Sequence, residues 1–500
     1  MKAFTLLLLL LPCSLGAQVL RIGPGGYASL QAAAVDARPG DTLLFMAGTH
    51  AGGSYISNLQ GRSDAWIVIT GPASGEARIT GGSTALQFSD PAYLKIRGLV
   101  FEGQTGNGVN IDDAGSMDTP AHDIIIEQCT FRDINATGNN DLLKMSGVDD
   151  FVVRDCVFLN GSPGGSMIDM VGCHDGLFEN NVFTNGGSNS IQAKGGTSDI
   201  LITRNRFING GQRAINIGGS TGLAFFRPSD ANFEAARIFI YANLFRGGMT
   251  PFAYVGAVHC DVANNTVLYP DKWVIRILQE TTDARFLQCG DNSFRNNLVV
   301  VDNRAISPSV NIGGNTRPET FTFANNLWYN SEQPSWAGPS LPSTETNGRY
   351  RTNPMLRDIA ANDVAPLAAS PAIGAGLSIP ELRFDLPGQR YNAPPSIGAI
   401  EGNPATTIVQ AMLPARETGM QIYPHPVGDG ASIRVFAAGE NEDVALLYDM
   451  LGKKIAGIPL RHSAAGVLSG RLEAAALPKG VYLLVLASQP QRRSIISVVR

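Results

Sequence analysis

The sequence predicts an all-β protein: a right-handed parallel β-helix with an N-terminal helical cap, followed by a small C-terminal β-sandwich. Three observations support this fold class. A short strand phrase recurs through the middle of the chain, period-2 alternation replaces helical periodicity within each copy, and the composition favours tight turns. Charged residues make up 16% and glycines number 56, whereas about a quarter of the residues are charged in ordinary globular proteins.

The recurring phrase is an apolar strand, then Asn or Cys, one further residue, and an aromatic or aliphatic residue, as in "LFENNVF" and "ILITRNRF". Its Asn or Cys positions lie 22 to 38 residues apart: Cys129, Cys156, Asn181, Asn205, Asn243, Asn265, Asn297 and Asn326. Short strands and Gly/Asn turns at this spacing predict one solenoid coil per copy. Leucine-rich repeats lack support because their Leu phrase is missing, and propeller blades need about 40 residues.

Equivalent residues of such coils stack at strand spacing, about 4.8 Å. An Asn at a turn can then hydrogen-bond to the Asn of the next coil, which makes the repeated Asn a structural ladder. Cys129 and Cys156 fall at ladder positions. The remaining cysteines after residue 17 are scattered without metal-ligand spacing, so buried thiols are expected throughout: Cys129, Cys156, Cys173, Cys260 and Cys289.

The segment "YASLQAAAVDARPGDTLLFMAGTH" contains a helical stretch, Leu30 to Ala37, and then a turn into a strand. A helix here would cap the open end of the solenoid. Together with "WIVITG", "ARITGG" and "YLKIRGLVFEG", this segment resembles the start of the pectin-lyase-like β-helix superfamily, and "LAASPAIGAG" and "SIGAIEGN" resemble its closing phrases. The β-helix is expected over residues 18–403, and the resemblance covers roughly residues 20–403. It implies the fold and leaves the activity open, because the superfamily includes lyases, hydrolases and proteins without catalysis.

The first 17 residues predict an export signal. Lys2 precedes the apolar run Leu6–Leu11 and small residues that allow cleavage after Ala17. No other window is long and apolar enough to span a membrane. The net charge of −5 and the absence of a basic stripe argue against a nucleic-acid partner. An exported monomer is expected.

A linker, residues 404–419, leads into alternating strands with Gly-containing turns over residues 420–500, which predict a small β-sandwich. This segment resembles the type A C-terminal sorting domain of Bacteroidetes type IX secretion. The resemblance lies in Tyr423–Pro426, in which His425 replaces the usual Asn, in Asp449–Lys453 and in Leu477–Tyr482. It implies the type IX secretion machinery as a partner and a location outside the outer membrane, released or surface-attached.

Chemistry is expected on the outward side chains of one parallel sheet. The coils are aligned on their recurring Asn or Cys. About eight residues after it, each coil has a strand in which one residue lies between two inward positions and therefore points outward. This gives an outward row: Asn110, Lys144, Asp169, Gln192, Asn216, Tyr254 and Arg276. Lys194 lies two positions further along its strand, and Arg213 comes just before the strand of its coil.

This row suits an acidic polysaccharide. The cations Lys144, Lys194, Arg213 and Arg276 can neutralise uronate carboxylates. Cleavage of a uronate glycan by β-elimination needs a base for the C5 proton and a positive group for the developing charge. Lys194 or Lys144 is the candidate base, if neighbouring cations lower its pKa, and Arg213 or Arg276 is the candidate stabiliser.

Other assignments stay open at this point. Asp169 is also a candidate calcium ligand together with Asp112, and a hydrolase would pair Asp169 with Glu280 or Asp283.

A long loop, "STGLAFFRPSDANFEAA", interrupts the coil spacing, and such loops often carry function. Phe225, Phe226 and Arg227 are predicted to form a sugar-stacking wall beside Arg213. Gln192, Asn216 and Tyr254 are predicted to bind substrate with Lys144. The alternative to a polysaccharide lyase is a surface β-helix that binds glycan or mediates adhesion without catalysis, because polar outward residues are expected on any solenoid.

Overall fold

The computed structural model describes residues 16–116, 118–306 and 308–403, and after these the segments 420–423, 431–436, 443–449, 453–464, 467–473, 477–478, 480–488 and 493–498. Residues 1–15 of the predicted signal and the predicted linker 404–419 lie outside the described residues. Parts of the sorting-domain motifs at 424–426, 450–452 and 479 also lie outside them.

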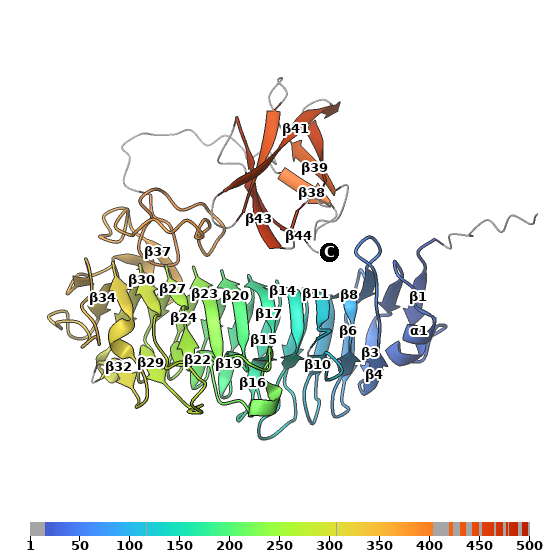
Figure 1. Ribbon diagram of the computed structural model, residues 1–500, viewed down its shortest axis with the longest axis horizontal. Helices are drawn as coiled ribbons and strands as arrows, with labels where there is room; N and C mark the ends of the chain where they lie inside the picture. Colours follow the sequence, from blue (N-terminus) through green and yellow to red (C-terminus); the bar gives the residue numbers. More distant parts are fainter. Residues whose placement is uncertain are drawn as a thin grey trace, which may run out of the picture.

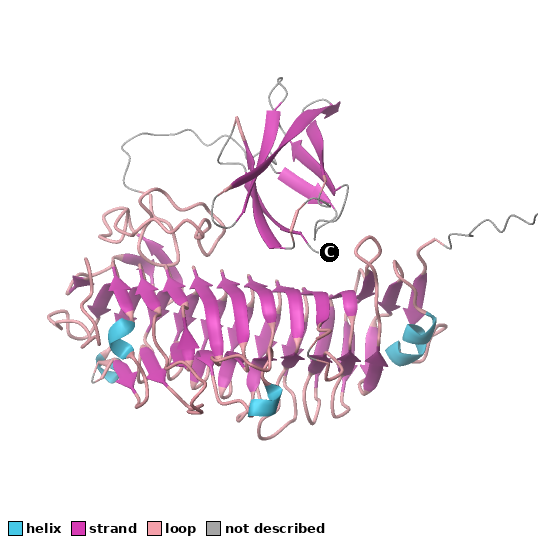
Figure 2. Ribbon diagram, in the orientation of Figure 1, coloured by secondary structure: helices cyan, strands magenta, loops and turns pink. Residues whose placement is uncertain are grey.

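Three long parallel sheets wind around one apolar core, as Figures 1 and 2 show. Each coil contributes a strand to the third, second and first sheet in turn. The first sheet contains β1 (Val19–Ile22), β2 (Thr42–Phe45), β5 (Ile67–Thr70), β8 (Ala92–Arg97), β11 (Ala121–Glu127), β14 (Val148–Arg154), β17 (His174–Glu179), β20 (Thr197–Thr203), β23 (Ala235–Tyr241), β26 (Ala257–Val258), β27 (Asp261–Ala263), β30 (Ser293–Arg295) and β33 (Thr322–Ala324). The predicted parallel β-helix is therefore confirmed.

The second sheet carries the candidate site. Its strands, in spatial order, are β4 (Ser54–Ser57), β7 (Leu86–Ser89), β10 (Val109–Asp112), β13 (Leu143–Ser146), β16 (Ser166–Val171), β19 (Asn189–Lys194), β22 (Arg213–Gly218), β25 (Phe252–Val255), β29 (Ile275–Leu278) and β32 (Val310–Ile312). Strands adjacent in this order pair in parallel, so residues of equal register form straight rows across the sheet.

The third sheet completes each coil with short strands: β3 (Gly48–Ala51), β6 (Ala77–Thr80), β9 (Leu99–Glu102), β12 (Thr130–Arg132), β15 (Val157–Leu159), β18 (Val182–Thr184), β21 (Arg206–Ile208), β24 (Leu244–Arg246), β28 (Thr266–Leu268), β31 (Leu298–Val301), β34 (Leu327–Asn330) and β35 (Arg349–Tyr350). The remaining elements of residues 16–403 are the helix α1 (Leu30–Asp36), the short 3-10 turns η1 (Leu223–Phe225), η2 (Asn303–Ala305) and η3 (Pro318–Thr320), and the antiparallel pair β36 (Leu356–Asp358) and β37 (Asp363–Pro366).

The helix α1 lies at the N-terminal end of the solenoid (Figure 1). It begins after Ser29, whose hydroxyl accepts a hydrogen bond from the N–H of Ala32 at 3.1 Å. Leu30 and Ala33 are buried against the first coils. This arrangement confirms the predicted helical cap, which ends one residue earlier than expected, at Asp36.

The recurring Asn forms a buried ladder at the turn between the first and third sheets. The carboxamide oxygen of each Asn accepts from the backbone N–H of the preceding coil, as when Asn181 N–H donates to Asn205 at 2.9 Å. Asn205 donates in the same way to Asn243 at 2.8 Å. Cys129 and Cys156 hold the same position. All five cysteines of the described residues are buried free thiols, as expected.

The aromatic residue that follows the ladder forms a second stack inside the core. The rings of Phe131, Phe158, Phe183, Phe207 and Phe245 lie in sequence with centroids 4.6 to 4.8 Å apart. This spacing is the strand spacing of the coils. The repeated phrase therefore sets both the turn and the core.

The C-terminal segments form a separate antiparallel unit of seven strands in the order β38 (Met420–Tyr423), β39 (Ala431–Phe436), β42 (Val467–Leu472), β41 (Lys454–Ala464), β40 (Asp443–Asp449), β43 (Gly480–Leu486) and β44 (Arg493–Val498). Its apolar cluster includes Ile433, Leu447, Leu460 and Leu484. This small all-β unit agrees with the predicted sandwich. None of the helices in the described residues has the length and apolar character to cross a membrane.

Replacing Asn205 with Ala is expected to lower the free energy of unfolding by about 2–4 kcal/mol, because it leaves buried backbone groups of two coils without partners. The measurement is denaturant unfolding of both proteins. The matched control is Asn185→Gly: Asn185 belongs to an exposed Asn row and has a positive φ that glycine tolerates. Equal losses of unfolding free energy in the two variants would contradict the stabilising role of the buried ladder.

Candidate functional site on the second sheet

The second sheet brings most of the predicted outward residues into one row. Asn110 of β10 pairs with Lys144 of β13, Lys144 with Asp169 of β16, Asp169 with Gln192 of β19, and Gln192 with Asn216 of β22. The row continues through Ala253 of β25 to Arg276 of β29. The register prediction was therefore right for six of its positions.

Tyr254 is a correction. It pairs with Ile217 and Ile277 on the inward face, and its ring is fully buried against Phe321. A shift of one residue moves a side chain to the other face of a sheet. All four residues of β25 are buried, so alternation in the sequence "FAYV" could not identify the outward one. Tyr254 does not contact substrate on this face, and Ala253 takes its place in the row.

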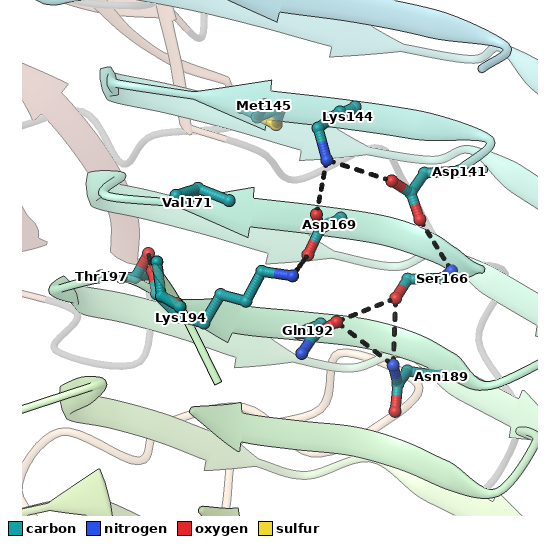
Figure 3. Close-up of polar contacts among 12 residues, drawn as sticks. Asp141, Lys144, Met145, Ser166, Asp169, Val171, Asn189, Gln192, Lys194 and Thr197 are labelled. Atoms are coloured by element: carbon teal, nitrogen blue, oxygen red, sulfur yellow. Dashed lines mark hydrogen bonds and ion pairs between the residues drawn. The ribbon is translucent and has the colours of Figure 1, made fainter. Parts of the chain in front are cut away.

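Four charged side chains on neighbouring strands form a charge cluster: Asp141, Lys144, Asp169 and Lys194 (Figure 3). Lys144 Nζ lies 2.8 Å from Asp169 Oδ2 and 3.4 Å from Asp141 Oδ2. Lys194 reaches across from β19, and its Nζ lies 3.2 Å from Asp169 Oδ1. Both carboxylates are buried, with 0% and 1% of their side chains exposed, and the lysines cover them.

The environment of the cluster shifts two pKa values. Burial and the neighbouring Asp169 raise the pKa of Asp141 to about 6, against the opposing effect of Lys144. Burial alone would lower the pKa of Lys144, but Asp169 and Asp141 raise it above its usual value. Lys144 therefore stays protonated. The expectation that neighbouring cations lower its pKa is wrong, because its nearest charged partners are carboxylates.

Beyond the charge cluster, Arg213 and Arg276 form an arginine pair. Arg213 donates to Asn216 Oδ1 at 3.1 Å and to Glu280 Oε1 at 2.8 Å. Arg276 donates to Asn311 at 3.1 Å and stacks on Trp273, with its guanidinium carbon 4.6 Å from the ring centroid. Burial and the positive charge of Arg213 lower the pKa of Arg276. The two guanidinium groups are therefore electrostatic neighbours, and the carboxylate of Glu280 is paired with Arg213.

The long loop 219–234 departs from its predicted role at Phe226. That ring is fully buried against Phe286 at 4.9 Å and beneath the guanidinium of Arg285 at 5.1 Å. Phe226 is thus a packing residue of the loop, whereas Phe225 remains 68% exposed. An isolated pair "FF" does not reveal which ring turns inward, because a loop lacks the alternation of a strand.

Arg227 likewise anchors the loop. Its guanidinium binds both carboxylate oxygens of Asp149 on β14, at 2.5 and 2.6 Å, and donates to the carbonyl of Gly172. It lies near the turn between the second and first sheets, away from Arg213. The structure therefore assigns Arg227 an ion pair that fixes loop 219–234, in place of the predicted contact with substrate.

Glu234 links two segments of the site through buried hydrogen bonds. This fully buried carboxylate accepts hydrogen bonds from the N–H of Gly195 at 2.9 Å, from the N–H and hydroxyl of Thr221 at 2.9 and 2.7 Å, and from the hydroxyl of Thr281. Gly195 follows Lys194, and Thr281 follows Glu280. A single side chain thus holds together the segments that carry Lys194 and the partner of Arg213.

The donor geometry does not favour the candidate calcium pair. Asp112 belongs to the register row of Ser146, and its oxygens accept from Ser89 at 2.7 Å and Gln87 at 2.6 Å. Asp169 lies in the other row, between two lysines. No group of three or more His, Cys, Asp or Glu side chains in the described parts of the chain has a metal-site arrangement.

The carboxylates of the candidate hydrolase pair are also engaged in ion pairs. Glu280 is bound to Arg213, and Asp169 is enclosed by Lys144 and Lys194.

Three buried acceptors on this sheet have no hydrogen-bond donor: Oδ1 of Asn110, Asp169 and Asn189. The amide nitrogen of Asn110 donates to Gln87, and that of Asn189 donates to Ser166, which fixes both oxygens as the unpaired atoms. Lys194 is near Asp169 Oδ1 without the geometry of a hydrogen bond. Buried acceptors in native proteins nearly always have partners, so these three call for a ligand or water that donates.

Sequence reasoning missed Asp141, Glu234 and Asn189 and weighed Glu280 only as a hydrolase partner. Asp141 is in the loop before β13, and Glu234 ends an inserted loop, so neither belongs to the repeat register. One signal was available in the sequence. Asp141 in "DLL" and Glu234 in "EAA" are acidic residues directly before apolar residues that lead into a strand, and an acidic residue is unusual at such a buried position.

Comparisons with known proteins agree with the fold. A family model described as the right-handed β-helix region matches residues 84–267, the central coils. A search of the curated proteins finds no match.

Several solved structures are similar at low identity. A pectate lyase, Pel9A, is 14% identical, with coverage of 78% of this chain and 97% of its own, and a TM-score of 0.44. An alginate lyase from Paenibacillus sp. is 17% identical, with coverages of 66% and 99% and a TM-score of 0.41. A rhamnogalacturonan lyase is 12% identical, with coverages of 62% and 87% and a TM-score of 0.43.

The buried Asp141 predicts a pH dependence of stability. Its folded pKa of about 6 exceeds the unfolded value of about 3.9. Its stabilising contribution is therefore complete below about pH 4 and is lost as the pH rises through about 6. From pH 4 to pH 7, Asp141→Asn should gain about 2–3 kcal/mol relative to the wild type. Urea unfolding at both pH values measures this, and parallel pH profiles would contradict it.

Proposed function

We propose that this protein is a polysaccharide lyase that cleaves an acidic, uronate-containing glycan on the outward face of the second sheet. The observation that carries the proposal is the placement of Lys194 and Arg213 on the neighbouring strands β19 and β22, beside buried acceptors that lack donors. Unpaired acceptors suit the hydroxyl groups of a sugar, and the guanidinium groups of Arg213 and Arg276 suit its carboxylate. The loops 219–234 and 279–288, joined through Glu234, bound this surface on one side.

The chemistry assigns one role to each side chain. β-Elimination removes the proton at C5 of a uronate while negative charge develops on its carboxylate. The C4–C5 double bond then forms as the C4–O bond to the leaving sugar breaks, and the leaving oxygen takes up a proton from water. Arg213 and Arg276 stabilise that charge as fixed positive groups. Lys194 accepts the C5 proton. Glu280 and Asn216 orient Arg213 through their hydrogen bonds.

Lys194 is preferred over Lys144 as the base. Lys144 contacts two carboxylates and donates to both, so its ammonium form is strongly favoured. Lys194 contacts Asp169 alone, without hydrogen-bond geometry. A hydroxyl group of the substrate that donates to Asp169 Oδ1 would weaken this remaining ion pair and leave Lys194 free to turn toward the sugar.

Lys194→Ala is expected to reduce kcat by about 100-fold or more, since it removes the general base. Arg213→Ala should lower kcat and raise KM, because the arginine contacts the carboxylate before and during reaction. Activity is measured on a panel of uronate polymers, with and without calcium, from the ultraviolet absorbance of the unsaturated product.

The matched control is Lys95→Ala, which removes a half-buried lysine paired with Glu127 on the first sheet and should leave activity unchanged. Activity that survives both site substitutions would overturn the assignment of residues. Glycan binding without product on any polymer would establish the alternative, a non-catalytic glycan-binding β-helix.

We further propose that the protein acts outside the cell, exported by residues 1–17 and then by type IX secretion through residues 420–500. The support is the sequence resemblance of residues 420–500 and the separate seven-stranded unit that they form.

In a bacterium with type IX secretion, a chain ending at residue 403 should remain in the periplasm, whereas the full chain should reach the surface or the medium. Immunodetection in the separated fractions measures the distribution. The control is the full chain with Lys95→Ala. Equal export of both lengths would contradict the role of residues 420–500.

A further inference from the structure

The charge of the outward face changes along the second sheet. At β10, Asp112 has its oxygens bound by neutral groups of Gln87, Ser89 and Asn110, and it makes no ion pair among the described residues. This part of the face is therefore negative. An acidic sugar placed here would meet a like charge, which disfavours its binding.

The middle of the face, at β13, β16 and β19, is neutral in sum. The charge cluster contains two lysines and two aspartates in alternating contact, so each ammonium group already has its counter-charge. The charges of the two lysines are therefore compensated by the two aspartates. They do not call for additional anions from a ligand.

The positive part of the face begins at β22. Arg213 is paired with Glu280, whereas Arg276 makes no ion pair among the described residues, which leaves one positive charge in excess. Lys272 adds an exposed ammonium group over the Trp273 ring at 4.2 Å. The residue of β25 between Asn216 and Arg276 in the row is Ala253, whose small side chain is uncharged and adds no counter-charge to the arginines.

The unpaired acceptors lie on the negative and neutral parts. Asn110 is on β10, Asp169 on β16 and Asn189 on β19. Asn110 and Asn189 each require a donor, and a carboxylate has none to offer, whereas a sugar hydroxyl does. Asp169 Oδ1 has only the ion pair with Lys194 at 3.2 Å. Strand spacing places β10 and β29 about 29 Å apart, a span that accommodates several sugars in a chain.

We propose that the second sheet binds a glycan of mixed composition, with one acidic sugar across β22 to β29 and neutral, hydroxyl-rich sugars across β10 to β19. This inference rests on the proposed function and deepens it by naming the substrate class: a heteroglycan of acidic and neutral sugars in place of a homopolymer of uronate. The negative Asp112 disfavours the homopolymer, and the arginine pair disfavours an entirely neutral chain.

The test uses the full-length protein and three oligosaccharides of equal length: neutral, all-uronate, and alternating uronate and neutral sugars. Calorimetric titration should give at least tenfold tighter binding of the alternating chain than of either other chain. Asp112→Asn keeps the size of the side chain and should tighten the all-uronate chain selectively. Arg276→Gln should abolish the preference of the alternating over the neutral chain. Lys95→Ala on the first sheet should leave all three affinities unchanged.

The outcomes separate this inference from the proposed function. Equal or tighter binding of the all-uronate chain, unaffected by Asp112→Asn, overturns the inference, and Lys194-dependent cleavage of that chain would at the same time support the lyase. Preferred binding of the alternating chain without cleavage supports the inference and rejects the lyase. Failure of all three chains to bind rejects both. If Asp112→Asn does not fold, the selectivity of the wild type and of Arg276→Gln still decides.

Discussion

The in-register stacking of identical side chains at one turn of the coil is the constraint on which the rest of the structure depends. Each Asn of the buried ladder satisfies backbone groups of its neighbour, and a phenylalanine two residues later stacks on its equivalent in the next coil. Both contacts are lost if one coil slips by a residue, so the ladder fixes the register of every strand that follows. The chain can then vary freely on its outward face without losing the fold.

This fixed register determines what the second sheet can hold. Neighbouring strands are about 4.8 Å apart, so Lys144, Asp169 and Lys194 come within ion-pair distance although 25 residues separate each from the next. The same spacing allows a carboxylate on one strand to neutralise cations on both sides. Two lysines that would attract an anion in isolation are therefore largely occupied with Asp169 and Asp141. Charge on a solenoid face has to be counted over neighbouring strands, because a residue's partners lie one coil away.

The two loops that interrupt the repeat supply hydrogen bonds and ion pairs that position residues of the second sheet. Loop 219–234 is fixed by the ion pair between Arg227 and Asp149 and by the buried ring of Phe226. Glu234 then links this loop to the segments after Lys194 and Glu280. Because Glu280 in turn holds Arg213, the position of a guanidinium on the sheet depends on hydrogen bonds made inside a loop. The coils and the loops anchored to them together define the outward surface of the second sheet, whose charge changes along the row of strands.

The sequence by itself determined the solenoid, its cap, the Asn ladder and the outward row except at β25, because repeated residues report a repeated environment. It wrongly placed Tyr254 outward in the position that Ala253 holds, since every residue of β25 is buried and alternation carries no information there. Only the tertiary structure decided that Phe226 faces inward, that Asp141 lies beside Lys144, and that Glu280 binds Arg213 across 67 residues. These contacts join loops outside the repeat to strands within it. Their partners are set by three-dimensional packing, and no local pattern in the chain encodes that packing.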